Sequence, residues 1–142
     1  MKVSTRVMYG MRLMFQLALH EGRGYMYLKD IAAREDISEK YLSQIVIPLR
    51  GSGLVTSSRG AHGGYRLAQP PARITARAVV EALDSDLRAA RWQQRKETDG
   101  SVTNLVWEAM FGKMIEALEG ITLKTLLDTH RARTASAVEY NI

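Results

Sequence analysis

The sequence predicts a mainly α-helical protein with one small β-hairpin. Two short segments with helical spacing of apolar residues, 28–34 and 38–50, are joined by a tight turn. A hairpin with a glycine-rich, basic tip follows at residues 54–68, and a long apolar helical pattern occupies residues 101–118. A helix pair followed by such a hairpin is typical of a winged helix-turn-helix. We therefore predict that fold, with a small β wing and a long C-terminal dimerisation helix.

The composition restricts the class of protein. A chain of 142 residues suggests one domain, or a small domain with an appendage. No apolar run approaches the roughly 18 residues that span a bilayer, and Arg6 and Arg12 interrupt the apolar start, so we expect a cytoplasmic protein with no membrane contact. The chain contains no cysteine, which excludes disulfides, thiolate zinc sites and cysteine-held iron–sulfur clusters.

Charge is distributed unevenly between the two halves. Residues 1–75 contain 11 Lys and Arg but 5 Asp and Glu, whereas residues 76–142 contain 9 and 10. The basic excess lies in the half with the helix pair and the hairpin, as expected for a phosphate-binding surface. A solvated basic face without a ligand explains the charge alone equally well.

Residues 1–84 form the predicted winged helix-turn-helix domain. Ser4 or Thr5 can cap a first helix that runs to about residue 20. Ser38 is a suitable N-cap for the third helix, and Pro48 is expected to kink or end that helix beyond its first two turns. The apolar side of the third helix comprises Tyr41, Leu42, Ile45, Val46 and Leu49. Short strands at 54–57 and 65–68 form the hairpin, and a fourth helix follows.

The second half is predicted to hold the subunit contact. Residues 85–100 are polar and are expected to form a loop, 101–130 a long helix and a short terminal helix, and 131–142 a loose tail. The long helix is apolar over more than one stripe, so it needs partners on two sides, one of which we expect to be a second subunit. The predicted dimer interface comprises Val102, Leu105, Val106, Ala109, Met110, Gly112, Met114 and Leu118.

The polar side of the third helix is the first candidate DNA-binding surface. Gln44 can bond to an adenine edge, and Lys40 can reach guanine acceptors or a phosphate. Ser38, Ser43 and Tyr41 could add short contacts. An ordinary amphipathic helix with a polar outer face is the plainer interpretation.

The hairpin tip is the second candidate surface. The guanidinium of Arg59 could enter a narrow minor groove, and His62 could contact a phosphate. Gly60, Gly63 and Gly64 would let the backbone approach the sugar and phosphate closely. A plain glycine turn with an exposed arginine is the alternative.

Other chemistries find little support. His20, His62 and His130 are scattered and make no metal-ligand spacing, so no metal site is predicted. The glycines match neither the phosphate-loop nor the dinucleotide-binding spacing. No catalytic pair can be identified, so we predict that the chain is not an enzyme and needs no cofactor.

The motifs resemble a known family. The matching segments are Ile37-Ser38 through Tyr41-Leu42, Leu49-Arg50, Gly53-Leu54-Val55, Arg59-Gly60, Gly63-Gly64-Tyr65 and Ile121-Thr122-Leu123 with Leu126. In this order and spacing they make the chain, from about residue 1 to residue 128, similar to the IscR/NsrR/CymR family of bacterial winged-helix transcription regulators.

The resemblance implies a homodimer that binds palindromic promoter DNA. It implies that the long helix pairs the subunits, and that the last segment packs on the partner's DNA-binding module. Base contacts would map onto Lys40, Ser43 and Gln44, the wing arginine onto Arg59, and phosphate contacts onto Ser4, Thr5, Arg6 and Tyr9. Arg50, Ser57 and Tyr65 complete the candidate DNA-binding set.

The chain departs from the family at one point. Many members carry three cysteines in the loop before the long helix, and these hold an iron–sulfur cluster. The corresponding loop, 86–104, has none. We therefore expect a regulator without a cluster, which senses an unidentified small molecule, binds a partner protein, or has no ligand. Trp92 and its basic neighbours could line an anionic effector site, although a solvated loop is the plainer interpretation.

The sequence therefore predicts a homodimeric transcription regulator, and a repressor rather than an activator, that binds double-stranded DNA. One rival is a winged-helix scaffold that binds another protein through its third helix and wing. A second rival, an enzyme acting on nucleic acid, lacks any candidate catalytic cluster.

Overall fold

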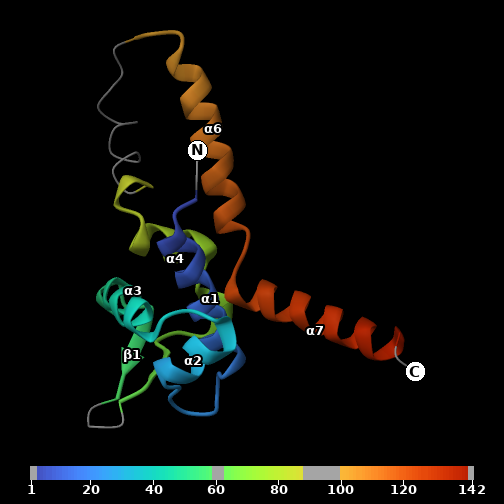
Figure 1. The fold of residues 1–142 in the computed structure, drawn as a ribbon. Helices are drawn as coiled ribbons and strands as arrows, with labels where there is room; N and C mark the ends of the chain where they lie inside the picture. The colour runs from blue at the N-terminus through green and yellow to red at the C-terminus, as the bar shows by residue number, and fades with distance from the viewer. Residues whose placement is uncertain (1–2, 59–62, 88–99, 141–142) are drawn as a thin grey trace.

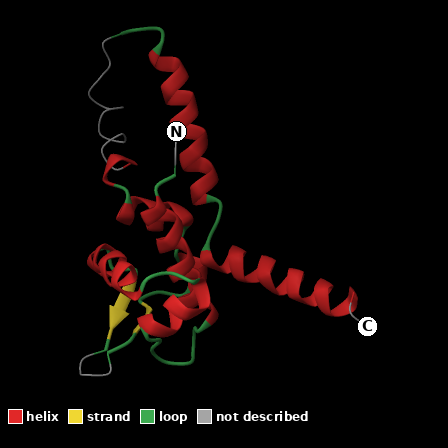
Figure 2. Cartoon of the chain, viewed as in Figure 1, coloured by secondary structure: helices red, strands yellow, loops and turns green. Residues whose placement is uncertain are grey.

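The computed structural model describes residues 3–58, 63–87 and 100–140. Its elements in chain order are α1 (Thr5–Leu19), α2 (Leu28–Glu35), α3 (Glu39–Gly51), β1 (Val55–Ser57), β2 (Tyr65–Leu67), the 3-10 helix η1 (Pro71–Arg73), α4 (Ala76–Leu83), α6 (Asn104–Glu119) and α7 (Leu123–Tyr140). The predicted fold class, mainly helical with one small antiparallel hairpin, is confirmed (Figure 2).

The helices α1 to α4 and the hairpin form one body, from which α6 and α7 extend in different directions (Figure 1). The body encloses an apolar core to which every helix within it contributes, together with the first turns of α7. Its fully buried side chains include Leu13, Met14, Ile31, Leu42, Ile45, Leu49, Ile74 and Leu123. This burial holds α3 against α1 and α2, because apolar surface removed from water stabilises the fold by about 25 cal/mol per Å².

Gly10 lies where α1 meets two other helices of this core. A Cβ atom at this position would overlap Leu83 Cδ1 of α4 and lie 3.4 Å from Ile45 Cγ2 of α3. Glycine therefore lets α1 lie directly against both neighbours.

The hairpin is joined to the body by an isolated β-bridge between Met26 and Tyr65 of β2. Strands β1 and β2 pair antiparallel, with Val55 opposite Leu67 and Ser57 opposite Tyr65. Met26 pairs with the outer edge of β2, since its N–H donates to the Tyr65 carbonyl and its carbonyl accepts the Tyr65 N–H, each at 2.8 Å. The base of the wing thus has backbone hydrogen bonds on both edges of β2.

The start of the predicted loop at 85–100 is helical. Residues 85–87 are helical because the Asp84 carboxylate accepts the backbone N–H groups of Asp86 and Leu87 at 2.9 and 3.1 Å, as an N-cap does. Residues 88–99, the rest of that loop up to Gly100, lie outside the described residues.

The prediction of a short last helix and a loose tail is wrong, because α7 continues to Tyr140. Two features explain its length. The segment 123–140 contains neither Gly nor Pro and includes several alanines, which favour helix. The beginning of α7 is also anchored in the core through Leu123 and Leu127, whereas its described residues beyond Leu127 are exposed.

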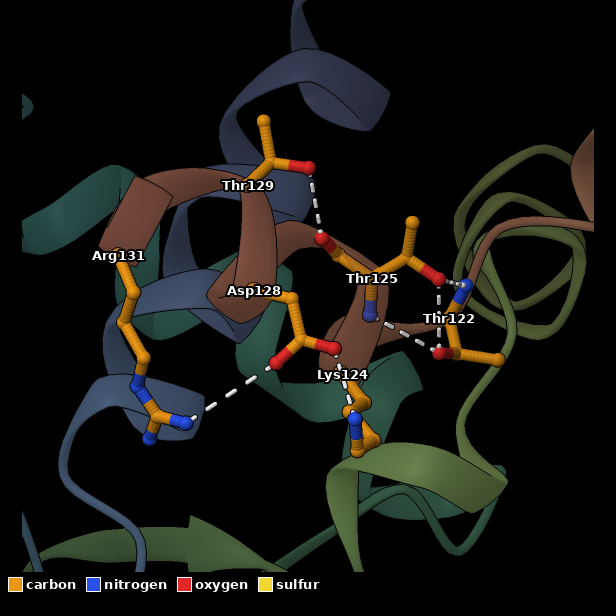
Figure 3. A network of polar contacts seen from close by, with 6 residues as sticks. All are labelled: Thr122, Lys124, Thr125, Asp128, Thr129 and Arg131. Carbon is orange, nitrogen blue, oxygen red and sulfur yellow. Dashed lines mark hydrogen bonds and ion pairs between the residues drawn. The ribbon is translucent and has the colours of Figure 1, made fainter. Parts of the chain in front are cut away.

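A polar network stabilises the first turns of α7 (Figure 3). The hydroxyl oxygen of Thr122 accepts the N–H of Thr125, and that of Thr125 accepts the N–H of Thr122, both at 3.1 Å. Asp128 accepts a hydrogen bond from Lys124 Nζ at 2.7 Å and lies 4.0 Å from the Arg131 guanidinium. The paired threonines satisfy N–H groups that a helix start leaves without intrahelical partners.

Candidate nucleic-acid interface

Helix α3 presents its polar side to solvent. Leu42, Ile45, Val46 and Leu49 are buried against the body. Their burial leaves the predicted contact residues exposed on the outer side, namely Lys40, Ser43, Gln44 and Arg50. The predicted division of the helix into two sides is therefore confirmed, except that Tyr41 is half-buried between them and Ile47 is exposed.

Two candidate serines in α3 already have partners within the helix. Ser38 caps it, because its hydroxyl oxygen accepts the Tyr41 N–H at 3.3 Å. The hydroxyl of Ser43 donates to the Lys40 carbonyl at 2.6 Å. Ser43 can then offer an incoming base only its acceptor lone pairs, since its one proton is in use. No comparable bond occupies the side-chain ends of Lys40 and Gln44 among the described residues.

Helix α1 contributes an aromatic side chain next to α3. The Tyr9 ring meets the Tyr41 ring edge to face, with centroids 5.7 Å apart, and the Arg12 guanidinium lies 5.6 Å from the Tyr9 centroid. At the start of α1, Ser4 caps the helix by accepting the Val7 N–H at 3.2 Å, while Thr5 and Arg6 are exposed.

An open hollow of about 480 Å³ unites these residues on one surface. It is lined by Tyr9, Asp36, Ile37, Ser38, Lys40, Tyr41 and Gln44. Five of the seven are sequence-predicted DNA-binding residues. Asp36 was missed by the sequence analysis, as was Arg12 beside the hollow. For Arg12 a signal existed, because it follows Tyr9 by three residues and so shares its helix face.

Gly64 has a packing role at the base of the wing. Ser58 closes the hairpin, since its N–H donates to the Gly64 carbonyl at 3.0 Å and its hydroxyl oxygen accepts the Gly64 N–H at 2.9 Å. Gly64 is buried, and a Cβ there would lie 2.9 Å from Tyr25 Cβ and 3.1 Å from the Met26 carbonyl oxygen. Glycine is therefore needed here for packing, and the DNA contact of Gly64 stays a prediction.

The remaining wing candidates divide into two groups. Gly63 is exposed, whereas Ser57 and Tyr65 are half-buried. Arg59, Gly60 and His62 lie outside the described residues, so their assignment stays a prediction. Arg66 of β2 was not among the predicted residues. Its guanidinium lies 4.5 Å from the Tyr25 ring centroid and joins the wing to the segment before α2.

Helix α6 carries the predicted subunit contact. Within the described residues it contains no buried side chain; Val102 just before it is 80% exposed, and Leu105, Val106 and Trp107 are 64, 60 and 54% exposed. Ala109 and Gly112 are exposed, and Met110, Met114 and Leu118 are half-buried. Trp107 was missed by the sequence analysis, although it lies within the same apolar pattern.

Two connections hold the base of α6 to the body. The Arg77 guanidinium of α4 bonds to Glu81 at 2.8 Å and to Glu119 at the end of α6. The hydrogen bond that Arg77 donates to Glu81, together with the weaker effect of the one it donates to Glu119, raises the pKa of Arg77 above its ordinary value. The Ala76 N–H also donates to the Ile121 carbonyl at 2.8 Å, just after α6. These connections fix the base of α6 to the body, and they do not involve the apolar sides of α6.

Comparison with known proteins decides the family. Residues 3–129 match the family described as Rrf2, iron-dependent transcriptional regulator. The chain belongs to the Rrf2 family. It is 37% identical over 126 residues to the HTH-type transcriptional regulator CymR of Bacillus subtilis, covering 89% of each chain. It is 32% identical over 139 residues to IscR of Aliivibrio salmonicida, covering 96% of this chain and 83% of the relative.

Solved Rrf2 structures confirm the fold. The IscR structure from T. potens superimposes with a TM-score of 0.77 at 42% identity, covering 92% of this chain and 88% of that one. CymR of B. subtilis superimposes with a TM-score of 0.76 at 34% identity, covering 91% and 98%. The expected resemblance is confirmed, and this Rrf2 protein is a DNA-binding transcription regulator and not an enzyme.

The residues present do not fit the iron named in the Rrf2 family description. The chain supplies no cysteine thiolate, because its sequence contains none. Among the described residues, no group of three His, Cys, Asp or Glu side chains could hold a metal ion. Within that same part of the protein, no helix has the length and apolarity needed to cross a membrane.

Proposed function

We propose that this Rrf2 protein is a homodimeric repressor that binds palindromic promoter sites. The observation that carries the dimer is the exposure of Leu105, Val106 and Trp107 on a helix whose base is fixed to the body. Leaving such large apolar side chains in water is unfavourable, and contiguous apolar patches on a protein surface mark interaction sites. A second copy of α6 would cover them, and two-fold pairing is the commonest way in which identical subunits associate.

Each subunit would then offer one copy of the surface around α3 to DNA. Lys40, Gln44 and Arg50 are exposed on the side of α3 that faces away from the core. A helix that is packed against a core on one side and exposed on the other can enter a major groove, which is wide enough to admit it. Two such helices related by a two-fold axis would recognise a palindromic site, because operator symmetry mirrors protein symmetry.

Repression follows most simply from this arrangement. A dimer that occupies promoter DNA excludes RNA polymerase by occupancy alone and needs no further surface. Binding to promoter DNA also supports a cytoplasmic location. An effector near Trp92 remains a prediction, since Trp92 lies outside the described residues.

Mobility-shift titrations of promoter fragments would test the proposal, with light scattering to determine the mass in solution. We expect a dimer whose affinity for its own promoter falls at least about a hundredfold between 50 and 200 mM salt. Gln44→Ala should relax sequence preference at one position of each half-site, at a cost of about 1–3 kcal/mol. Arg50→Ala, its matched partner on the same side of α3, should weaken all sequences similarly. A monomer in solution would contradict the proposal. An affinity for DNA that does not change with salt concentration would also contradict it, and would instead fit a protein-binding scaffold.

A further inference from the structure

The backbone conformation of Asp36 limits which residue types can occupy this position, but it does not require a negative charge. It lies between α2 and α3, and its φ of 52° is the only positive value for a residue other than glycine in the described part of the chain. Asp, Asn and Gly all tolerate this left-handed conformation. The turn therefore requires one of a small group of residues, and it does not require a carboxylate.

The Asp36 carboxylate shares the hollow with the side chains proposed to contact bases. Lys40 and Gln44 line the same hollow, together with Tyr9 and Tyr41. Asp36 is exposed, and its carboxylate makes no hydrogen bond or ion pair with another described residue. Glu35, the acid next to it, differs in this respect, because its carboxylate accepts a hydrogen bond from Gln16 Nε2 at 2.6 Å. Asp36 thus presents unpaired acceptors in the hollow that Lys40 and Gln44 also line.

An acid at this place has few favourable partners on DNA. It is repelled by phosphates, and it cannot accept from the acceptor atoms of guanine or thymine in the major groove. Its favourable partners are the amino groups at N4 of cytosine and N6 of adenine. The carboxylate therefore favours duplexes with an amino group beside it and disfavours every other duplex.

We infer that Asp36 is a specificity-determining residue, which accepts a hydrogen bond from a cytosine or adenine amino group in each half-site and weakens binding to other DNA. This inference rests on the proposed function, because it places α3 in the major groove. It assigns to an acidic residue a discrimination that Lys40 does not provide, since a lysine gains affinity from phosphates in any sequence.

Selection from a random duplex library, followed by titration of the selected and the random duplexes, would test the assignment. Asp36→Asn keeps the turn and nearly the same shape while it removes the charge. We expect this variant to bind random duplex several-fold more tightly, because the charge that phosphates repel is gone. Asp36→Gly, which also suits the turn and has no side-chain acceptor, should in addition lose the cytosine or adenine preference at one symmetric position, so that its specificity ratio falls roughly tenfold.

Glu39→Gln is the matched control. Glu39 is an exposed acid in the first turn of α3, but it does not line the hollow. This variant should keep the base preference of the wild type. Unchanged preference in Asp36→Gly, or equal loss in Glu39→Gln, would overturn the assignment while the wild type still bound DNA. A wild type that bound no duplex at low salt would instead overturn the proposed function, and the assignment with it.

Discussion

The ring of Tyr9 on α1 meets the ring of Tyr41 on α3 edge to face, with an interplanar angle of 89°. This contact joins the first helix to the exposed beginning of α3. It lies at the hollow that contains Lys40 and Gln44. The packing of α1 therefore bears directly on the position of the proposed DNA-reading side chains.

The Tyr9–Tyr41 pair should contribute to stability beyond the area that it buries. A double-mutant cycle with Tyr9→Leu and Tyr41→Leu should give a coupling free energy of about 0.5–1.5 kcal/mol in chemical denaturation. Tyr9→Phe and Tyr41→Phe serve as controls, since both keep the rings and should keep the stability. A coupling below about 0.3 kcal/mol would mean that the two rings act independently.

Gly10 should tolerate no side chain. Gly10→Ala forces Leu83 and Ile45 apart in the core, and we expect it to lower the free energy of unfolding by about 1–3 kcal/mol. Gly51→Ala, at the exposed end of α3, is the matched control, because no described atom lies within 4 Å of its added Cβ. Alanine favours helix over glycine, so this control should not lower the intrinsic stability of α3. Equal destabilisation by both changes would contradict the packing described for Gly10.

The apolar surface of α6 should determine the oligomeric state. Leu105→Asp introduces a charge into the proposed interface, and we expect the dimer dissociation constant to rise at least about tenfold, since burying one leucine contributes about 1.5–3 kcal/mol. Light scattering over a concentration series would measure this change. Glu108→Ala, at an exposed polar position of the same helix, should leave the dimer intact. A Leu105→Asp protein that stayed dimeric would place the subunit contact elsewhere.

The reciprocal cap at the beginning of α7 should stabilise the whole domain, because Leu123 next to it is buried in the core. Thr122→Ala removes the acceptor of the Thr125 N–H, and we expect a loss of about 1 kcal/mol in the free energy of unfolding. Thr134→Ala is the control. The Thr134 hydroxyl bonds to the His130 carbonyl within the exposed part of α7, where alanine is the better helix former. Equal losses from the two changes would show that the cap is not what stabilises this region.

Much of the fold could be predicted from local patterns. The spacing of Leu42, Ile45 and Leu49 indicated which side of α3 is buried, and the exposure of Lys40 and Gln44 followed from it. Ser38 was correctly predicted as the N-cap. Such features depend on residues three or four positions apart on one helix, so the sequence displays them directly.

Other features depend on residues far apart in the chain. The packing role of Gly64 could not be predicted, because Tyr25 and Met26, which occupy the space beside it, lie nearly forty residues earlier. The length of α7 was not predicted, because the segment is only weakly amphipathic. Its beginning is anchored by the hydrogen bond from the Leu123 N–H to the Ile74 carbonyl, which joins residues far apart in the chain. In both cases the sequence contained the residues but not the contact between them.

The sequence by itself determined the helix pair, the hairpin, the apolar α6 and the absence of thiolate ligands. Only the tertiary structure decided that Asp36 shares a hollow with Tyr9 and Gln44, that Gly10 lies against Leu83 of α4, and that Arg77 and Glu119 hold α6 to the body. The physical reason is the range of the interactions. Periodicity and capping act within a few residues, whereas packing and ion pairing join segments that the chain separates.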